Sequence, residues 1–246
     1  MSIETGLILA SGQGKRMGSL ANFYPKCLLL IYDRPILYNI LTHFENLGVK
    51  DTYIVINYQK ELIKSYCYDV RADFKQKIKF VEQNDFSGSA SAVGLLKEVI
   101  DAPFITVLGD DCTFTKSLIG FVHDFYTTNA IVLEAIVKED NMDVIKSTCC
   151  ILMDEKNLIT KIVEKPANPE SNLRGCGVYI FDPKIFPYIE STKIRGVERV
   201  ITDTISLIVD EKKAYGKILD GINININNCD DLLVANKLYK KYREEL

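Results

Sequence analysis

The sequence predicts an α/β protein with a mostly parallel, mixed sheet and helices on both faces. Apolar runs of strand length alternate with segments of helical periodicity through the first half of the chain, and a hairpin pattern follows in the second half. The first apolar run ends in a loop that contains two glycines. Ligands of such sheets gather at the carboxyl ends of the strands, so we expect the site residues there.

Four strands and three helices are expected in the first half. The strands are short apolar or β-branched runs, at 5–10, 52–56, 78–81 and 104–108. The helices are segments in which apolar residues recur every three or four positions, at 36–47, 60–69 and 88–100. Gly48 marks the end of the first helix, because glycine accepts the left-handed conformation that commonly closes a helix.

The second half has more β-hairpin character. Strands are expected at 131–137 and 176–181, a hairpin from 149–153 and 158–163 around the turn 154–157, and helices at 200–209 and 230–246. We interpret the chain as one domain, residues 1–246. A nucleotide-binding half of about residues 1–125 and a substrate-binding half of about residues 126–246 are expected to share the sheet.

Composition excludes several classes of function. The chain has 246 residues, 47% of them hydrophobic, and a net charge of −3 with cations and acids interspersed, so neither a nucleic-acid-binding stripe nor a membrane-seeking face is expected. No apolar run approaches about 18 residues, and no basic segment precedes an apolar one at the start, which predicts neither a transmembrane helix nor a signal peptide. The seven cysteines include no C-x-x-C pair and suit buried positions in a reducing cytoplasm. Homo-oligomerisation is left open.

The first loop has the features of a phosphate cradle. Gly12 and Gly14 form a G-x-G turn that lets backbone N–H groups converge on an anion, and Arg16 and Lys26 add full positive charges. Met17 stands where G-x-G-x-x-G needs its third glycine, and no P-loop pattern is present, so the standard dinucleotide and P-loop interpretations are weak. An ordinary turn with surface cations explains a bare G-x-G equally well.

Polar residues follow three of the other expected strands. Asp110 lies at the mouth of one, where it could hold Mg²⁺ against phosphate oxygens or cap a helix. Glu164 and Lys165 precede Pro166, which ends the strand and presents two charges at a defined place, unless they form only a solvated turn. Gln83 could pair with the edge of a base or be a loop amide.

These features form a series of motifs along nearly the whole chain. In order they are Gly12-x-Gly14-x-Arg16-Met17 with Pro25-Lys26, Ile31 to Tyr38, Gln83 with Gly88-Ser89-Ala90, Leu108-Gly109-Asp110-Asp111, Val163-Glu164-Lys165-Pro166, Gly177 to Phe181, and Asn227 to Leu233. The series resembles that of the sugar-1-phosphate nucleotidyltransferases, the nucleotide-sugar pyrophosphorylases, and is nearest to the glucose-1-phosphate thymidylyl- and uridylyltransferases.

The resemblance implies a fold, a reaction and its partners. The fold is the Rossmann-like nucleotide-diphospho-sugar transferase fold. The reaction is Mg²⁺-dependent attack of a sugar 1-phosphate on the α-phosphorus of a nucleoside triphosphate, with dTTP or UTP favoured, giving an NDP-sugar and pyrophosphate. The chain would then be an enzyme of class EC 2.7.7 whose partners are these two small molecules.

The resemblance also implies catalytic roles. Arg16 would brace the β- and γ-phosphates of the leaving group and Lys26 the α-phosphate. Asp110 would hold the metal, and Lys165 would bind the attacking phosphate. This type of transfer depends on alignment and on neutralising charge rather than on strong acids or bases, which cationic side chains suit.

Binding residues follow in the same way. Those implied for the nucleotide are Leu9, Ala10, Gly12, Gly14, Lys15, Gln83 and Gly88, where Gln83 and Gly88 would read a pyrimidine. Those implied for the substrate sugar phosphate are Asp111, Cys149, Glu164, Lys165, Gly177 and Glu198, with Glu164 accepting hydroxyl hydrogen bonds. Those implied for the metal are Asp110 and Asn225.

Four positions depart from the family pattern. Lys15 replaces a threonine or serine, Cys149 replaces a glycine at the back of the sugar pocket, and Asn223 replaces a tryptophan. Asn225 replaces the second metal-binding aspartate, so a dianionic site becomes monoanionic and its metal affinity should fall. Asn227 is an alternative metal ligand, because other branches of the superfamily have an asparagine two places further on.

Two other functions remain open. A cytidylyltransferase of the same fold, acting on another phosphorylated alcohol or sugar, is suggested by Cys149 and by the run 223–225. A non-catalytic nucleotide-sugar-binding subunit is suggested by Asn225, although the retention of Arg16, Lys26, Asp110 and Lys165 argues against it.

Overall fold

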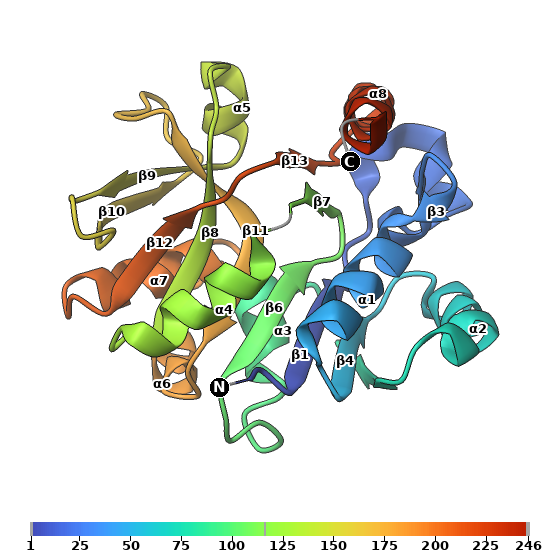
Figure 1. Ribbon diagram of the computed structural model, residues 1–246, viewed down its shortest axis with the longest axis horizontal. Coiled ribbons are helices and arrows are strands. Elements are labelled where there is room, and N and C mark those ends of the chain that lie inside the picture. Colours follow the sequence, from blue (N-terminus) through green and yellow to red (C-terminus); the bar gives the residue numbers. More distant parts are fainter. Residues whose placement is uncertain (1, 116, 245–246) are drawn as a thin grey trace. The chain divides into compact units, whose positions relative to one another are not determined.

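The computed structural model describes residues 2–115 and 117–244 (Figure 1). The chain divides into two compact units. We call the segments Ser2–Phe86, Val107–Lys116 and Gly221–Leu246 the outer unit, because they contain both ends of the described chain. We call the segments Ser87–Thr106 and Ser117–Asp220 the central unit.

Seven strands of the described residues form a mixed main sheet. The outer unit contributes β1 (Thr5–Ala10), β4 (Asp51–Ile56) and β5 (Lys77–Glu82), which pair in parallel. The central unit contributes β8 (Val132–Lys138), with β12 (Ala214–Ile218) parallel and β11 (Leu173–Phe181) antiparallel to it. Strand β6 (Phe104–Leu108) begins in the central unit and ends in the outer one. The predicted α/β class with a mixed sheet is confirmed.

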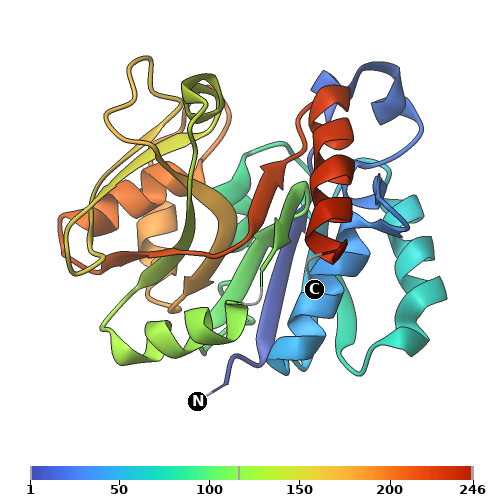
Figure 2. The same cartoon turned by 45° about the horizontal axis from the view of Figure 1, so that its top comes forward.

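The helices of the outer unit cover buried strands and close the chain. Helix α1 (Ile36–Leu47) lies along β1 and β4 in Figure 1. Gly6 of β1 makes this packing possible, because a side chain there would overlap the buried ring of Phe44. The remaining α-helices of this unit are α2 (Lys60–Val70) and α8 (Cys229–Glu244), the latter drawn in red in Figure 2.

Short elements complete the outer unit. Three 3₁₀ segments, η1 (Lys15–Asn22), η2 (Lys26–Leu28) and η3 (Arg71–Asp73), lie in its loops. A small ribbon pairs β2 (Leu30–Ile31) with β3 (Arg34–Pro35). A second antiparallel ribbon, which the sequence analysis did not predict, pairs β7 (Asp111–Phe114) with β13 (Ile222–Asn225).

The central unit contains the predicted hairpin and five helices within the described residues. Strands β9 (Cys149–Met153) and β10 (Ile159–Glu164) pair antiparallel around the expected turn. The helices are α3 (Ser89–Gly94), α4 (Leu118–Thr127), α5 (Met142–Ser147), α6 (Ile185–Ser191) and α7 (Ile201–Val209). In the part of the chain that the structure describes, no helix is long and apolar enough to cross a bilayer.

The helix predicted over 88–100 is wrong in its length. Helix α3 ends at Gly94, and the N–H groups of Leu96, Lys97 and Val99 then donate to carbonyls three residues back rather than four. Glycine is a poor helix former, and here it also admits Ile189 of α6, whose Cγ2 would lie 3.3 Å from a Cβ at position 94.

No disulfide joins the seven cysteines, and six of them are buried, as expected for small hydrophobic residues. Cys229, at the start of α8, is the exposed exception.

Candidate functional site

The predicted site residues fall into two groups, one in each unit, and we describe each group by itself. The donor half-site denotes the group in the outer unit: the loop 9–17, Lys26, Gln83, Asp110, Asp111, Asn225 and Asn227. The acceptor half-site denotes the group in the central unit: Gly88, Cys149, Glu164, Lys165, Gly177 and Glu198.

The loop after β1 is shaped by Gly14. Its φ is +65°, a conformation that favours glycine, and a Cβ there would lie only 3.0 Å from Cγ of Lys26. The carbonyl of Gly14 accepts from the N–H of Met17, which begins a 3₁₀ turn and buries the methionine. Met17 is therefore a core residue. Around Gly12, by contrast, the space is open, and Lys15 and Arg16 are exposed on the same loop.

Gln83 is bound to this loop. It follows β5, lies buried, and accepts a 2.6 Å hydrogen bond at Oε1 from Oγ of Ser11. Its main-chain carbonyl accepts from Nδ2 of Asn57. The residue predicted to read a base therefore lies beside the glycine loop.

Lys26 and Asp110 form the central ion pair of the donor half-site. Nζ of Lys26 lies 2.8 Å from Oδ2 of Asp110, and the two side chains are 13% and 27% exposed. Each charge is partly desolvated, so the attraction between them is stronger than in a surface pair. The geometry brings together two of the four residues predicted to be catalytic.

Arg16 is held by the start of α8. One of its terminal nitrogens donates to Oδ1 of Asn227 at 2.5 Å. Asn227 is itself placed by Oδ2 of Asp231, which accepts from the N–H groups of Asn227 and Asn228 while Oδ1 of Asn228 accepts from the N–H of Asp231. This reciprocal arrangement is a capping box, so the local sequence around Asn228 positions the partner of Arg16.

Asn225 and Asn227 differ in how their side chains are used. Oδ1 of Asn227 accepts from Arg16, whereas the half-buried side chain of Asn225 makes no hydrogen bond within the described residues. The chain between them is anchored at Asp110, whose main-chain carbonyl accepts from the N–H of Ile226 at 2.9 Å. Asp110, directly before β7, and Asn225 of β13 thus offer a carboxylate and an amide oxygen that has no hydrogen bond within the described residues.

Asp111 faces into the protein. It is 2% exposed, and its Oδ1 accepts from Oγ1 of Thr113 at 2.7 Å and from Nδ2 of Asn223 at 2.6 Å. Its predicted contact with the substrate stays a prediction. The structure explains Asn223 instead: the residue that replaces the family tryptophan satisfies a buried carboxylate across the β7–β13 ribbon.

In the acceptor half-site, Gly88 has a structural reason to be glycine. Its φ is +96°, and a Cβ there would overlap the main chain of Arg199. The N–H of Ala90 donates to the carbonyl of Arg199, and the N–H of Arg199 donates to the carbonyl of Ser87. The close approach expected for a base is made here by another stretch of backbone.

Glu164 and Lys165 end β10 as predicted. Oε2 of Glu164 accepts from Oγ1 of Thr202 at 2.9 Å, which fixes the carboxylate. Lys165 has a positive φ of 45°, held by its N–H bond to the carbonyl of Thr148, and 62% of its side chain is exposed. Strained backbone of this kind clusters at functional sites, and here it presents the ammonium group to solvent.

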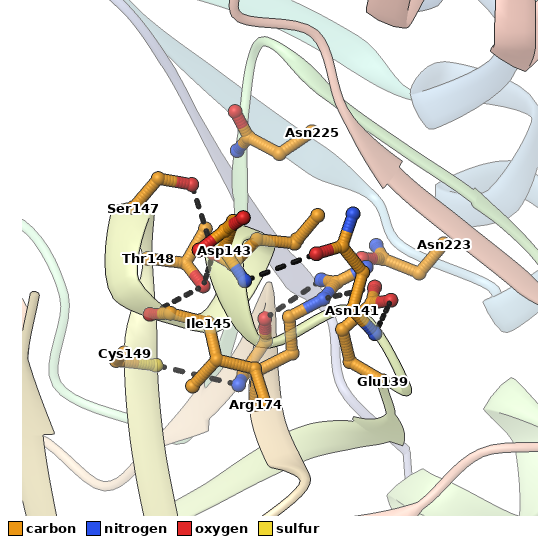
Figure 3. Close-up of polar contacts among 12 residues, drawn as sticks. Glu139, Asn141, Asp143, Ile145, Ser147, Thr148, Cys149, Arg174, Asn223 and Asn225 are labelled. Atoms are coloured by element: carbon orange, nitrogen blue, oxygen red, sulfur yellow. Dashed lines mark hydrogen bonds and ion pairs between the residues drawn. The ribbon is translucent and has the colours of Figure 1, made fainter. Parts of the chain in front are cut away.

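Cys149 lies opposite Glu164 in the β9–β10 hairpin. The thiol is buried and accepts from the N–H of Gly175 at 3.3 Å, as the dashed line from Cys149 shows in Figure 3. Burial, followed by the charge of Glu134, raises the pKa of Cys149 well above its ordinary value. The thiol is therefore protonated at neutral pH, which does not suit a nucleophile, and its predicted contact with the substrate stays a prediction.

Gly177 and Glu198 complete the acceptor half-site. Gly177 has a φ of +71° in β11, within the register shift between Gly175 and Tyr179. Glu198 is exposed in a tight turn in which its N–H and carbonyl bond to the main chain of Arg195.

Sequence reasoning missed Glu134. It lies on β8, is 0% exposed, and neither carboxyl oxygen has a hydrogen-bond partner within the described residues. Burial, with a further contribution from Glu164, raises the pKa of Glu134 to about 8. The signal was present in the sequence, because Glu134 is the only acid in the apolar run 131–137.

Proteins of known class are similar to this chain. A family model described as nucleotidyl transferase matches residues 5–241. The bifunctional protein GlmU of Methanocaldococcus jannaschii is 36% identical over 235 residues, which are 94% of this chain and 53% of that protein. The mannose-1-phosphate guanyltransferase of Candida albicans is 28% identical over 252 residues, 98% of this chain and 67% of that protein. The chain spans about half the length of the GlmU proteins that it matches.

The fold is also found among solved structures. UDP-glucose pyrophosphorylase in complex with UDP-glucose superposes with a TM-score of 0.85 at 22% identity, over 98% of this chain and 99% of that one. At this identity the likeness shows the fold, and it confirms the Rossmann-like prediction.

Proposed function

The chain belongs to the nucleotidyl transferase family, and we propose that it joins a nucleoside triphosphate to a sugar 1-phosphate, giving an NDP-sugar and pyrophosphate. The observation that carries this proposal is the Lys26–Asp110 ion pair beside the glycine loop, at the carboxyl end of β6. We favour dTTP or UTP as the donor. A relative named mannose-1-phosphate guanyltransferase makes GTP the first alternative to test.

In the donor half-site, two cations are available for the triphosphate. Arg16 is exposed on the loop and held at one nitrogen by Asn227, so its other nitrogens can contact the β- and γ-phosphates. Lys26 is held by Asp110 within reach of the loop backbone and would contact the α-phosphate, where charge develops. Pre-positioned charges of this kind do not need to reorganise during the reaction.

In the acceptor half-site, Lys165 would bind the phosphate group and Glu164 the sugar. The ammonium of Lys165, 62% exposed, would bind and orient the attacking phosphate. Glu164 would accept hydrogen bonds from sugar hydroxyls, with its carboxylate already oriented by Thr202.

Asp110 and Asn225 fit a Mg²⁺ ion, since both offer oxygen atoms and Mg²⁺ takes oxygen ligands. We propose Asn225 rather than Asn227 as the second ligand, because the amide oxygen of Asn227 already accepts from Arg16. The described residues contain no group of three or more His, Cys, Asp or Glu that could hold a metal, so phosphate oxygens and water would complete the coordination. When bound, the ion would neutralise charge on the phosphate oxygens.

We also propose a cytoplasmic location, supported by seven cysteines without a disulfide, which suit a reducing compartment. The enzyme's partners would be its two small substrates, without nucleic acid or membrane, and a homo-oligomer stays open.

The test is pyrophosphate release with each of dTTP, UTP, CTP, GTP and ATP against a panel of sugar 1-phosphates and phosphorylated alcohols, with and without Mg²⁺. Metal-dependent release with dTTP or UTP and a hexose 1-phosphate is the expected result. Release only with CTP would instead favour the cytidylyltransferase alternative. Nucleotide binding without turnover across the panel would favour the non-catalytic subunit and overturn the proposal.

A further inference from the structure

Glu134 has an unusual environment for a charged residue. Its carboxyl group is fully buried in β8, and both oxygens lack a hydrogen-bond partner within the described part of the chain. Buried polar groups in folded proteins are nearly always paired, because an unpaired one loses its bonds to water without compensation. Two unpaired carboxyl oxygens in the interior therefore call for a partner that the described residues do not supply.

The surroundings of the carboxyl group connect it to the acceptor half-site. A side chain on Gly175 would overlap Oε1 of Glu134, and its Cβ would lie 3.3 Å from Sγ of Cys149. Glu134 also pairs with Tyr179 across the β8–β11 ladder, directly after the register shift that contains Gly177. Cys149 and Gly177 are both predicted substrate contacts, so Glu134 lies next to residues that are predicted to bind the sugar phosphate.

The charges nearby strengthen this connection. Glu164, a third predicted substrate contact, is close enough to contribute to the raised pKa of Glu134. Arg174 directs Nε to Oε2 of Glu139 at 3.2 Å and one terminal nitrogen to the carbonyl of Gly175 at 3.3 Å, and Figure 3 shows it extended toward Glu139. The carboxyl groups of Glu134 and Glu164 thus interact electrostatically in the acceptor half-site. Within the described residues only that of Glu164 has a hydrogen bond, from Thr202.

We propose that Glu134 is a specificity-determining residue of the acceptor half-site, where its carboxyl group hydrogen-bonds a hydroxyl or ammonium group of the phosphate acceptor. This inference rests on the proposed function, because the ligand is the acceptor of that reaction. Gly175 and the thiol of Cys149 lie on the Oε1 side of this carboxyl group, and both belong to strands that carry predicted substrate contacts.

The protonation of Glu134 suits such a role. With a pKa of about 8 the carboxyl group is mostly protonated at neutral pH, so it can donate one hydrogen bond and accept another. A hydroxyl group has the same two capacities, and an ammonium group would instead bind the ionised form. A site built to pair with such a group rejects an analogue that lacks it, because the buried carboxyl is then left unpaired again.

The experiment measures acceptor binding directly. Isothermal titration calorimetry is performed on wild type, Glu134→Leu, Glu134→Gln and the control Glu155→Gln, whose exposed side chain lies in the hairpin turn. The probes are glucose 1-phosphate, mannose 1-phosphate, N-acetylglucosamine 1-phosphate and glucosamine 1-phosphate, together with deoxy analogues of the tightest of them. Turnover with the favoured nucleotide is measured in parallel.

Glu134→Leu should weaken binding of the preferred acceptor about tenfold or more. It should also abolish the preference that wild type shows for this acceptor over one of its deoxy or deamino analogues. Glu134→Gln, which keeps a donor and an acceptor, should retain that preference if the ligand group is a hydroxyl and lose it if the group is an ammonium. Glu155→Gln and the affinity of every variant for the nucleotide should be unchanged. Removal of a buried, unpaired carboxyl does not threaten folding, so Glu134→Leu is a usable variant.

Unchanged affinity and unchanged preference in Glu134→Leu would overturn the inference while leaving the function intact. Acceptor binding that depends on Glu134, without pyrophosphate release in wild type, would support the inference and overturn the catalytic proposal. Absence of acceptor binding in wild type across the whole panel would overturn both.

Discussion

Asn223 donates from Nδ2 to Oδ1 of Asp111 at 2.6 Å, and both residues are buried in the ribbon that β7 forms with β13. Asp111 directly follows Asp110, the proposed metal ligand. This bond therefore holds in place the start of β7, next to Asp110. A residue that departs from the family pattern thus has a defined structural task.

Asn223→Leu should lower the free energy of unfolding by about 1–3 kcal/mol, because the buried carboxylate of Asp111 loses one of its donors. Urea unfolding monitored by circular dichroism measures the change. The matched control is Asn168→Leu at an exposed position, which should leave the midpoint where it is. Equal stability of Asn223→Leu and wild type would contradict the role given to Asn223.

Lys26→Ala should lower turnover about a hundredfold or more if Lys26 stabilises charge that develops in the transition state. The measurement is kcat for pyrophosphate release at saturating substrates. Lys97→Ala removes a surface lysine that pairs with Glu190 and should behave as wild type. A near wild-type rate for Lys26→Ala would remove this residue from the mechanism, and its ion pair with Asp110 would be structural only.

Asn225→Asp should lower the Mg²⁺ concentration that gives half-maximal activity by about tenfold, because a carboxylate replaces an amide among the ligands. Mg²⁺ titration of initial rates measures the effect, and Asn227→Asp is the comparison, since that side chain is bound to Arg16. If only Asn227→Asp shifts the titration, the metal ligand is Asn227. Asp110→Asn should abolish the metal-dependent rate in the same assay.

Glu134 should make stability depend on pH. Burial and the carboxylate of Glu164 raise its pKa from 4.5 to about 8, so the folded protein holds a proton that the unfolded chain releases between these values. The free energy of unfolding should therefore fall as pH rises through this window, by up to about 1.4 kcal/mol per pH unit from this group. The burial-raised pKa of the adjacent Cys149 keeps that thiol neutral across the same window.

Glu134→Gln should remove this slope and be more stable than wild type at pH 8, as urea unfolding at pH 5, 6.5 and 8 would show. Glu155→Gln should retain the wild-type slope, because its side chain is exposed. A slope that survives in Glu134→Gln would mean that the carboxyl is already ionised in the folded protein.

Local signals in the sequence were sufficient for many elements. Gly48 ends α1 in the left-handed conformation, with a φ of +79°, as its position predicted. The turn 154–157 joins β9 to β10 as predicted, with Asn157 at a φ of +63°. These features depend on backbone preferences of a few adjacent residues, which a sequence displays directly.

Long-range pairings could not be predicted in the same way. The β7–β13 ribbon joins segments more than a hundred residues apart, and a segment as short as Asp111–Phe114 does not indicate which distant strand it pairs with. Helix α3 ends early partly because Ile189 packs against Gly94, another contact across the chain. The apolar periodicity of residues 88–100 does not indicate that Ile189 will pack there.

The sequence by itself determined the family, the α/β class and the order of the motifs, because glycines, apolar runs and charged strand ends carry those properties in their own chemistry. Only the tertiary structure decided which polar groups are already paired. It bonds Asn227 to Arg16, leaves the side chain of Asn225 without a hydrogen bond within the described residues, and turns Asp111 inward toward Asn223. It buries Glu134 with no hydrogen-bond partner among the residues that the structure describes. Whether a polar side chain is satisfied depends on atoms from distant segments, and only folding brings those atoms together.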